Sequence, residues 1–377
     1  LPTNQPAVKT RIGDADVTAG GNVTLTSNVD VSTDGDAITA AGGILGGLVG
    51  AIADSNTKPT VNTFIDNGAT VNATGAVNLL STVDNDSDAN TTGIGAGLLG
   101  AGASLAYATI EGSTKTYVSG AVPAAASLQI AAKDVSDADT DSLAVAGGIV
   151  SGSGSEAKSK TNRTVNAYLS GGTASVGTSA SPIAGDVVIR AESTTDADST
   201  TLGISVGGVA IGVALSDSQA NPTVNGYIGA PLYTNGGVTV DALHNVSPAG
   251  TAINNTSAAE ATAGSGGLVG GTGADSDAVV SPTVKAYANA TGVLQAGTNS
   301  PVSIRALSNN KADSKVLSIA VALVAGGAAL SDAKTEGITE AYLDRDLNYA
   351  GSLTIKAESV DSAVSDATAG AGGIVSG

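Results

Sequence analysis

Aspartate is the residue type in this chain whose spacing could do chemistry. In five of seven similar segments an aspartate stands eleven residues after the start of a short strand-like phrase: Asp34, Asp88, Asp139, Asp198 and Asp313. If the segments stack, the first four form a like-charged column, which is costly unless water or a cation relieves the repulsion. Because Ca²⁺ takes oxygen ligands, these aspartates are candidate calcium ligands, and solvated turn residues are the favoured interpretation.

Other chemical motifs are weak. The aspartate run at 84–88 departs from a calcium-binding EF-hand loop, because Ala89 stands where glycine is needed and Gly95 where glutamate is needed. The segment 270–275 matches a calcium-binding nonapeptide only once, although that site needs tandem turns. His244, the only histidine, is expected to be solvated. No nucleophile elbow or phosphate loop is present, so we predict that the chain is not an enzyme.

The elements that would position these aspartates come from a repeat. A phrase of the form apolar-x-apolar begins at Val23, Val77, Leu128, Val187, Val238, Val302 and Leu353. The first six copies are followed 40 or 41 residues later, or 49 in one case, by an aromatic residue: Phe64, Tyr117, Tyr168, Tyr227, Tyr287 and Tyr342. A constant segment joined by a variable one indicates a structural repeat. We therefore predict a single array over residues 1–377, in units of 51–64 residues, with both ends truncated.

One unit shows which secondary structure to expect. Residues 186–191 alternate apolar and polar, as a half-buried strand does. Large residues then alternate with small ones on both sides of the pair Gly207–Gly208, where the register shifts by one. Such a shift indicates a bulge or a corner. A further strand opens at Pro222, in a Pro-Thr-Val sequence that also occurs at Pro59 and Pro282.

Strands that recur in one order without a helix between them predict an all-β fold, a repetitive β-solenoid resembling a β-helix. Successive turns of a solenoid lie about 4.8 Å apart, so the six aromatic residues would stack in one column whose role is packing. Tandem antiparallel β-hairpins or sandwich modules are the structural alternative. Membrane helices in glycine-rich segments such as 37–53 are a second alternative, although these segments fit a period of two better.

Composition limits the partners. Glycine accounts for 51 of 377 residues, and Cys, Met and Trp are absent, so small side chains must fill the core. The formal net charge of -18 disfavours nucleic acid or an anionic membrane as a partner, because both require clustered cations. The absence of cysteine removes disulfides and thiolate metal sites but does not identify a compartment.

The order of features within a unit resembles a known kind of repeat. A unit begins with Val-x-Ile-x-Ala and an Asp-rich run, and continues with a Gly-Gly and Ile/Val-rich strand and then Pro-Thr-Val-x-x-Tyr-Ile. This order is similar to the repeats of very large bacterial surface adhesins, the leukotoxin-type or filamentous-haemagglutinin-like proteins. The resemblance covers nearly the whole chain. It implies a secreted stalk or passenger segment at the bacterial cell surface, and it carries over no catalytic residue.

The repeat and the resemblance to adhesins lead us to consider three functions. A structural stalk, whose partners are copies of itself or other surface proteins and glycans, is the first. Assembly into an extracellular fibre is the second. The third is a β-helical carbohydrate-active enzyme, a polysaccharide lyase or hydrolase that uses paired carboxylates on a strand face.

Overall fold

The computed structural model describes residues 3–289 and 292–377, and this part of the chain is all-β. It contains no helix, and therefore none of the length and apolar character needed to cross a membrane. The glycine-rich segment 37–53, which could have been a membrane helix, lies in strands β4 (Val23–Gly42) and β5 (Gly46–Thr57) and in the turn between them. The prediction of an all-β chain is confirmed.

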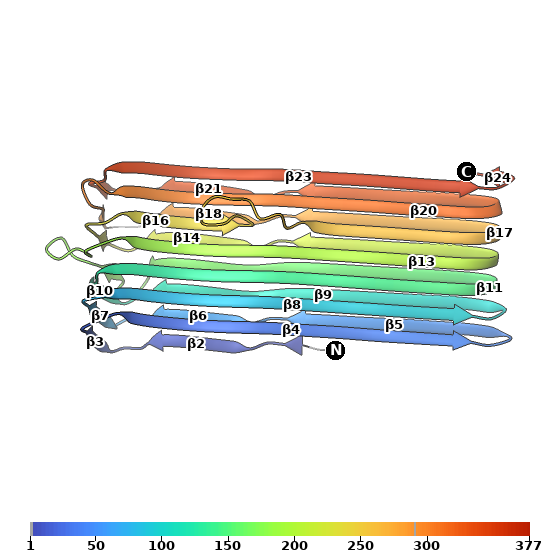
Figure 1. The fold of residues 1–377 in the computed structure, drawn as a ribbon, viewed down its shortest axis with the longest axis horizontal. Helices are drawn as coiled ribbons and strands as arrows, with labels where there is room; N and C mark the ends of the chain where they lie inside the picture. The colour runs from blue at the N-terminus through green and yellow to red at the C-terminus, as the bar shows by residue number, and fades with distance from the viewer. Residues whose placement is uncertain (1–2, 290–291) are drawn as a thin grey trace.

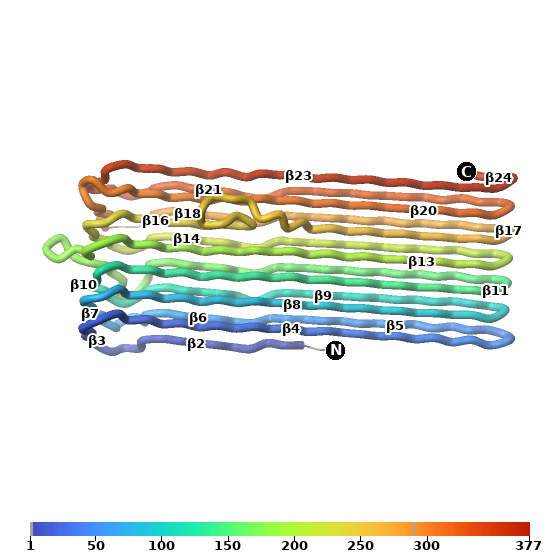
Figure 2. The backbone as a smooth tube through the Cα atoms, viewed as in Figure 1, coloured from blue at the N-terminus to red at the C-terminus, as the bar shows by residue number. Residues whose placement is uncertain are grey.

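Each unit contains a long outgoing strand that ends at a tight turn, followed by a strand that returns behind it (Figures 1 and 2). The outgoing strands are β4, β8 (Ala76–Ala96), the first parts of β11 (Ser127–Ser170) and β13 (Val187–Ala220), β16 (Val238–His244) with the start of β17 (Ser257–Val280), the first part of β20 (Pro301–Thr335), and β23 (Ser352–Gly372). The returning strands are β5 with β6 (Thr60–Ile65), β9 (Leu99–Val118), the second parts of β11, β13, β17 and β20, then β14 (Thr223–Gly229), β18 (Thr283–Ala288), β21 (Ile338–Leu343) and β24 (Val375–Ser376).

A third, short strand closes each unit at the end opposite the turn. These strands are β3 (Asp16–Ala19), β7 (Thr70–Ala73), β10 (Ala121–Ala124), β12 (Ser175–Val176), β15 (Leu232–Tyr233), β19 (Leu294–Gln295) and β22 (Leu347–Asn348), and they form a sheet of their own. Strands β1 (Thr3–Asn4) and β2 (Ala7–Ile12) pair with β5 and β6. We call the three-sided end the base and the end with the tight turns the tip.

Neighbouring units pair strand to strand in parallel. The phrase starts lie in one column, since Val77 pairs with Val23 and with Leu128, and the pairing continues through Val187, Val238 and Val302 to Leu353. Among the described residues the only antiparallel pairing is an isolated bridge between Val246 and Ala252, within one loop. The ladders therefore do not fit the alternative of antiparallel hairpin or sandwich modules.

The interior differs between the two ends. At the base, buried Val, Leu and Ile side chains such as Leu79, Ile130 and Ile189 form one continuous apolar core. Towards the tip, the inward positions hold small residues, and the buried clusters consist mainly of alanine. The layers approach closely there: a Cβ atom added to Gly203 would lie 2.3 Å from the carbonyl oxygen of Val213 on the returning strand. The tip is therefore a thin two-layer slab without room for large inward side chains.

The pair Gly207–Gly208 lies at the tip turn of its unit, where β13 changes from outgoing to returning. Gly148 and Gly267 pair with Gly207 in the neighbouring units. The shift in alternation that indicates a bulge or corner in the sequence is thus the reversal between the two layers.

Candidate functional site

The predicted aspartate column lies on the outer face of the outgoing strands. Asp34 pairs with Asp88, Asp88 with Asp139, and Asp139 with Asp198. Ala258 then interrupts the column before Asp313. The structure therefore brings four of the five candidate residues together and leaves the fifth apart, where Asp313 Oδ2 lies 3.2 Å from Lys315 Nζ.

A second acidic column runs beside the first, two residues nearer the base. It contains Asp86, Asp137 and Asp196, which pair across β8, β11 and β13. The Asp-x-Asp spacing in the sequence is the signal for this second column, because residues two apart on a strand face the same side. The two columns make a grid of carboxylates on one flat face.

Crowding and burial raise the pKa values of these carboxyls. Burial is the largest cause for Asp139, whose pKa rises to about 7, and the charges of Asp137, Asp198 and Asp88 add to it. Burial likewise raises the pKa of Asp196 to about 7, with a contribution from Asp198. The pKa values of Asp88 and Asp198 rise to about 6, again mainly because of burial. Proton uptake near neutral pH can therefore relieve part of the repulsion.

Four of the predicted calcium ligands lie side by side along the sheet, one on each neighbouring strand. Ca²⁺ takes six to eight oxygen ligands. Within residues 3–289 and 292–377, no three Asp, Glu or His side chains converge closely enough to hold an ion. The carboxylates stand side by side on adjacent strands, and two of them accept backbone hydrogen bonds, Asp196 Oδ1 from Thr256 N and Asp198 Oδ1 from Ala258 N. Calcium binding by the column stays a prediction.

The six predicted aromatic residues stack in one column on the outer face of the returning layer. Consecutive rings from Phe64 to Tyr342 lie 4.7–4.9 Å apart, with interplanar angles of 5° or less. Phe64 is buried and also lies 5.6 Å from Lys9 Nζ, whereas Tyr168 and Tyr227 are half-buried. Each inner ring covers the face of the next, so these ring faces are occupied by packing and are closed to a sugar or a base.

Burial raises the pKa values of the stacked phenols. The pKa of Tyr168 rises to about 12, with a smaller contribution from Tyr117, and that of Tyr227 rises as well. These hydroxyls therefore remain protonated at neutral pH, and the column is electrically neutral.

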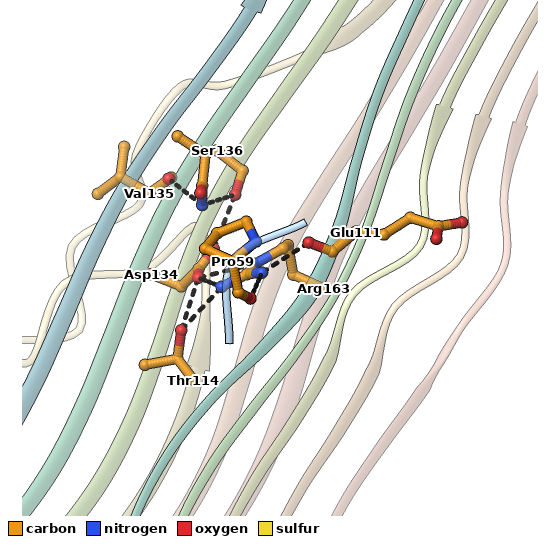
Figure 3. A network of polar contacts seen from close by, with 8 residues as sticks. Pro59, Glu111, Thr114, Asp134, Val135, Ser136 and Arg163 are labelled. Atoms are coloured by element: carbon orange, nitrogen blue, oxygen red, sulfur yellow. Dashed lines mark hydrogen bonds and ion pairs between the residues drawn. The ribbon is translucent and has the colours of Figure 1, made fainter. Parts of the chain in front are cut away.

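A buried ion pair that the repeat pattern did not predict lies between the layers (Figure 3). Arg163 Nη2 lies 2.7 Å from Asp134 Oδ2, and both side chains are fully buried. Arg163 Nη1 donates to the carbonyl oxygens of Pro59 and Glu111, at 2.8 and 2.7 Å. Thr114 Oγ1 donates to Asp134 Oδ2 at 2.9 Å. The guanidinium thus joins three units.

The sequence did contain a signal for this network. Arg163 precedes Thr164–Val165 where other units have proline, as in Pro59 and Pro222. It pairs with Gly112, whose φ is +108° and whose added Cβ would lie 2.5 Å from Arg163 Nη1. Asp134 takes the place that Val83 holds in the preceding unit. Every strong donor and acceptor is used internally, so the network has a structural role.

His244 is fully buried, which corrects the expectation that it is solvated. It occupies the column of Asp134, where Ser193 and Ser308 stand in the adjacent units. Neither ring nitrogen has a hydrogen-bond partner, and burial lowers the pKa of His244 to about 4. The imidazole is therefore neutral at pH 7, and it is closed to solvent.

The nine-residue insertion that follows His244 covers the outer face of the outgoing layer near the base. Val246 packs on Leu243 and Leu307. Beside them the buried Asp241 accepts from Arg305 Nε at 2.8 Å and from Arg190 Nε at 3.1 Å. Arg305 Nη2 also donates to the carbonyl oxygen of Pro248 at 3.1 Å. The insertion is thus held in place by these contacts, beside the fully buried His244.

Comparison with known protein families, with curated proteins and with solved structures gave no match.

Proposed function

We propose that this chain is a structural segment, the stalk or passenger region of a secreted bacterial surface adhesin, and that it winds as a β-solenoid. The observation that supports this function is the continuous in-register pairing of equivalent residues across seven units, from Val23 to Leu353. Polar side chains of types that form active sites in enzymes, such as Arg163 and Asp134, here bind residues of neighbouring units. The repeat style similar to adhesins supplies the cellular context.

The solenoid has a measurable repeat. The aromatic rings advance 4.7–4.9 Å per unit, so a stalk of this design lengthens by about 4.8 Å for each turn of the chain. Oriented samples should give an X-ray reflection near this spacing along the axis on which the units stack, perpendicular to the strands (Figure 1). A far-UV circular dichroism spectrum dominated by helix would contradict the solenoid.

The location can be tested on intact cells of the source organism. The loop 245–256, which contains the nine-residue insertion, is suited to an antibody, since its residues 248–252 are exposed. We expect the antibody to label unbroken cells, and an antibody against a cytoplasmic protein to label only broken ones. Labelling of the insertion only after lysis would contradict the surface role.

A carbohydrate-active enzyme is the second candidate. The observation that favours it is the set of raised pKa values in the acidic grid, because a carboxyl such as Asp139 with a pKa of about 7 could act as a general acid. The grid lies on a flat face, whereas sugar chains usually bind in clefts. Screening of acidic polysaccharides, with an Asp139→Asn variant as control, separates the two: cleavage lost in the variant would favour the enzyme.

A further inference from the structure

The tip half of each unit carries no charged residue, although the chain has a net charge of -18. The uncharged stretches are 37–53, 89–110, 142–155, 199–216, 261–274, 316–331 and 367–377. Because small residues fill the interior there, large apolar residues face outward: Ile38 is 79% exposed, Leu48 74% and Ile211 54%. Exposed apolar areas of this extent mark interaction sites in soluble proteins.

A groove runs across this region on the outgoing face. One wall contains Ile204 and Val206 of the fourth unit, and the other contains Leu317 and Ile319 of the sixth. Two strand spacings separate the walls, about 9.6 Å. The groove has a volume of about 320 Å³.

Glycine makes the floor of this groove. Gly264 of the fifth unit pairs with Ile204 on one side and Ile319 on the other. Gly266 lies beside it, next to Val206. The nearest atom to an added Cβ is 3.8 Å away at both glycines, so larger residues would fit the fold. The groove therefore exists because the fifth unit has no side chains here, and filling it need not disturb the backbone.

The outer face of the returning layer carries a ridge. Val209, Ile211 and Leu215 of the fourth unit, with Val213 among them, form a single ridge that is 40–54% exposed at the three named positions. Glycines flank its middle on both sides: Ile211 pairs with Gly152 and Gly271, and Val213 with Gly154 and Gly273. An added Cβ at any of these four glycines would meet nothing within 4 Å. The ridge is therefore one strand wide at Ile211 and Val213, whereas Val209 has a valine on each side and Leu215 has Glu156 and Asp275.

We propose that the ridge of one copy of this chain docks into the groove of a second copy. Both features are built on the same strand spacing, so a ridge one strand wide matches a groove between walls two strands apart. No charged residue pairs with Ile211 or Val213, and Glu156 and Asp275 flank only Leu215 at the end of the ridge, whereas contact between the acidic grids of two copies would be repulsive throughout. The second copy is the occupant that this match favours, because it carries the complementary surface itself.

The available area suits a specific interface. Eight residues of strand and seven units give a tip face of about 26 by 34 Å, or about 900 Å², and stable interfaces bury about 800 Å² per partner. The insertion above Leu307 projects from the base half of the outgoing face, so the second copy overlaps the tip half only. Ridge and groove lie on opposite faces of the slab. The contact is therefore heterologous and can propagate through successive copies.

Sedimentation velocity on the full chain tests the contact with three variants. Ile211→Asp places a carboxylate on the ridge, and Gly264→Leu fills the groove; each should weaken self-association at least about tenfold. Ile44→Asp is the matched control, because Ile44 is 89% exposed at the tip turn and lies outside both features. It should associate as the unaltered chain does. Melting curves verify that each variant is folded; Val206→Asp on the groove wall replaces Gly264→Leu if that variant is unfolded, and Val213→Asp on the ridge replaces Ile211→Asp.

Mixing the two defective variants is the decisive step. Ile211→Asp retains its groove and Gly264→Leu retains its ridge, so a 1:1 mixture should form dimers and nothing larger. The proposal is overturned if the unaltered chain is monomeric at about 0.1 mM, well above the dissociation constants of ordinary specific interfaces, or if the mixture does not dimerise. Loss of association in Ile44→Asp would also overturn it, by placing the contact at the turns.

This inference deepens the proposed structural role by giving it a lateral contact, and the two fail separately. A monomeric chain that is still labelled on intact cells removes the contact alone. An associating chain found only inside cells removes the surface role alone.

Discussion

The base and the tip of this molecule use the same alternation of residues with opposite outcomes. At the base, Ile189 of β13 points inward and is fully buried, and charged residues lie outside. Farther along the same strand, Ile211 points outward and is 54% exposed, while Ala210 and Ala214 lie inside. The comparison teaches that the separation of the two layers decides which face of a strand is buried. The base has three sides, which leave room for inward Val, Leu and Ile side chains. The tip consists of two closely packed layers, which do not.

Substitutions at the boundary between the base and the tip should lower the free energy of unfolding the most. Arg163→Ala leaves the buried carboxylate of Asp134 without its partner, and removing one member of a buried ion pair costs about 3–5 kcal/mol. Urea denaturation should show this loss. The double variant Arg163→Met with Asp134→Val should recover most of it, because Val83 already occupies the corresponding position. Equal losses in the single and double variants would mean that the ion pair is not what stabilises the boundary.

Two isoleucines of β13 compare base and tip directly. Ile189→Ala should lower the free energy of unfolding by about 2–5 kcal/mol, since it opens a cavity in the base core. Ile211→Ala should change it by no more than about 0.5 kcal/mol, because surface substitutions rarely do more. Chemical denaturation of the two variants provides the measurement. Similar losses at both positions would show that the tip is packed like the base.

Overpacking tests the narrow interior of the tip. Ala144 is fully buried and its neighbour Val145 faces outward. Ala144→Leu should destabilise the chain by about 1–3 kcal/mol, because the layers have no room for the extra carbons. Val145→Leu should be nearly neutral by the same urea measurement. A tolerated leucine at position 144 would mean that the layers can separate.

The aromatic column tests packing on the outside of the base. Tyr168→Ala removes two stacking contacts and should cost about 1–3 kcal/mol, at about 0.5–1.5 kcal/mol for each ring pair. This is less than a fully buried ring would lose, because Tyr168 is only half-buried. Tyr168→Phe should be mild, since Phe64 stacks without a hydroxyl. Thermal melting of both variants checks the order, and equal losses would shift the role to the hydroxyl.

The smallest effect concerns pH. The pKa values of Asp139 and Asp196 are raised to about 7, so the folded chain takes up protons that the unfolded chain does not. Stability should therefore rise as pH falls from 8 to 6. Below about pH 6.5 the lowered pKa of His244, about 4, acts in the opposite direction, because stability is lost as pH falls through that value. Because at least two raised carboxyls oppose one histidine, melting temperatures should still rise as pH falls from 6.5 to 4, but with a shallower slope than the carboxyls alone would give.

Matched variants separate the two groups. Asp139→Asn should flatten the rise between pH 8 and 6, and His244→Ser should make the rise steeper below about pH 6.5, since serine stands at the equivalent positions 193 and 308. The calcium hypothesis predicts something else: EDTA lowers the melting temperature, and millimolar Ca²⁺ restores it where NaCl of equal ionic strength does not. That result would replace protons by calcium as the relief of the acidic grid.

The sequence by itself determined the repeat, its register and its all-β character. The equal spacing between the phrases and the aromatic residues predicted that equivalent residues of neighbouring units pair. The pairing of Phe64 with Tyr117 confirms this. The same spacing placed four of the five candidate aspartates in one column. Asp313 keeps the register of that column but lies apart from the other four, because Ala258 of the unit with the insertion stands between it and Asp198.

Only the tertiary structure decided what lies inside. Alternation with a period of two separates large from small residues but does not say which set faces the second layer, because that depends on how closely the layers approach. For the same reason the local pattern did not predict the burial of His244 or the outward ridge at Ile211, and it marked Arg163 and Asp134 as exceptions to the repeat without showing that they pair. Each depends on residues of the opposite layer or of a neighbouring unit, which the local pattern does not record.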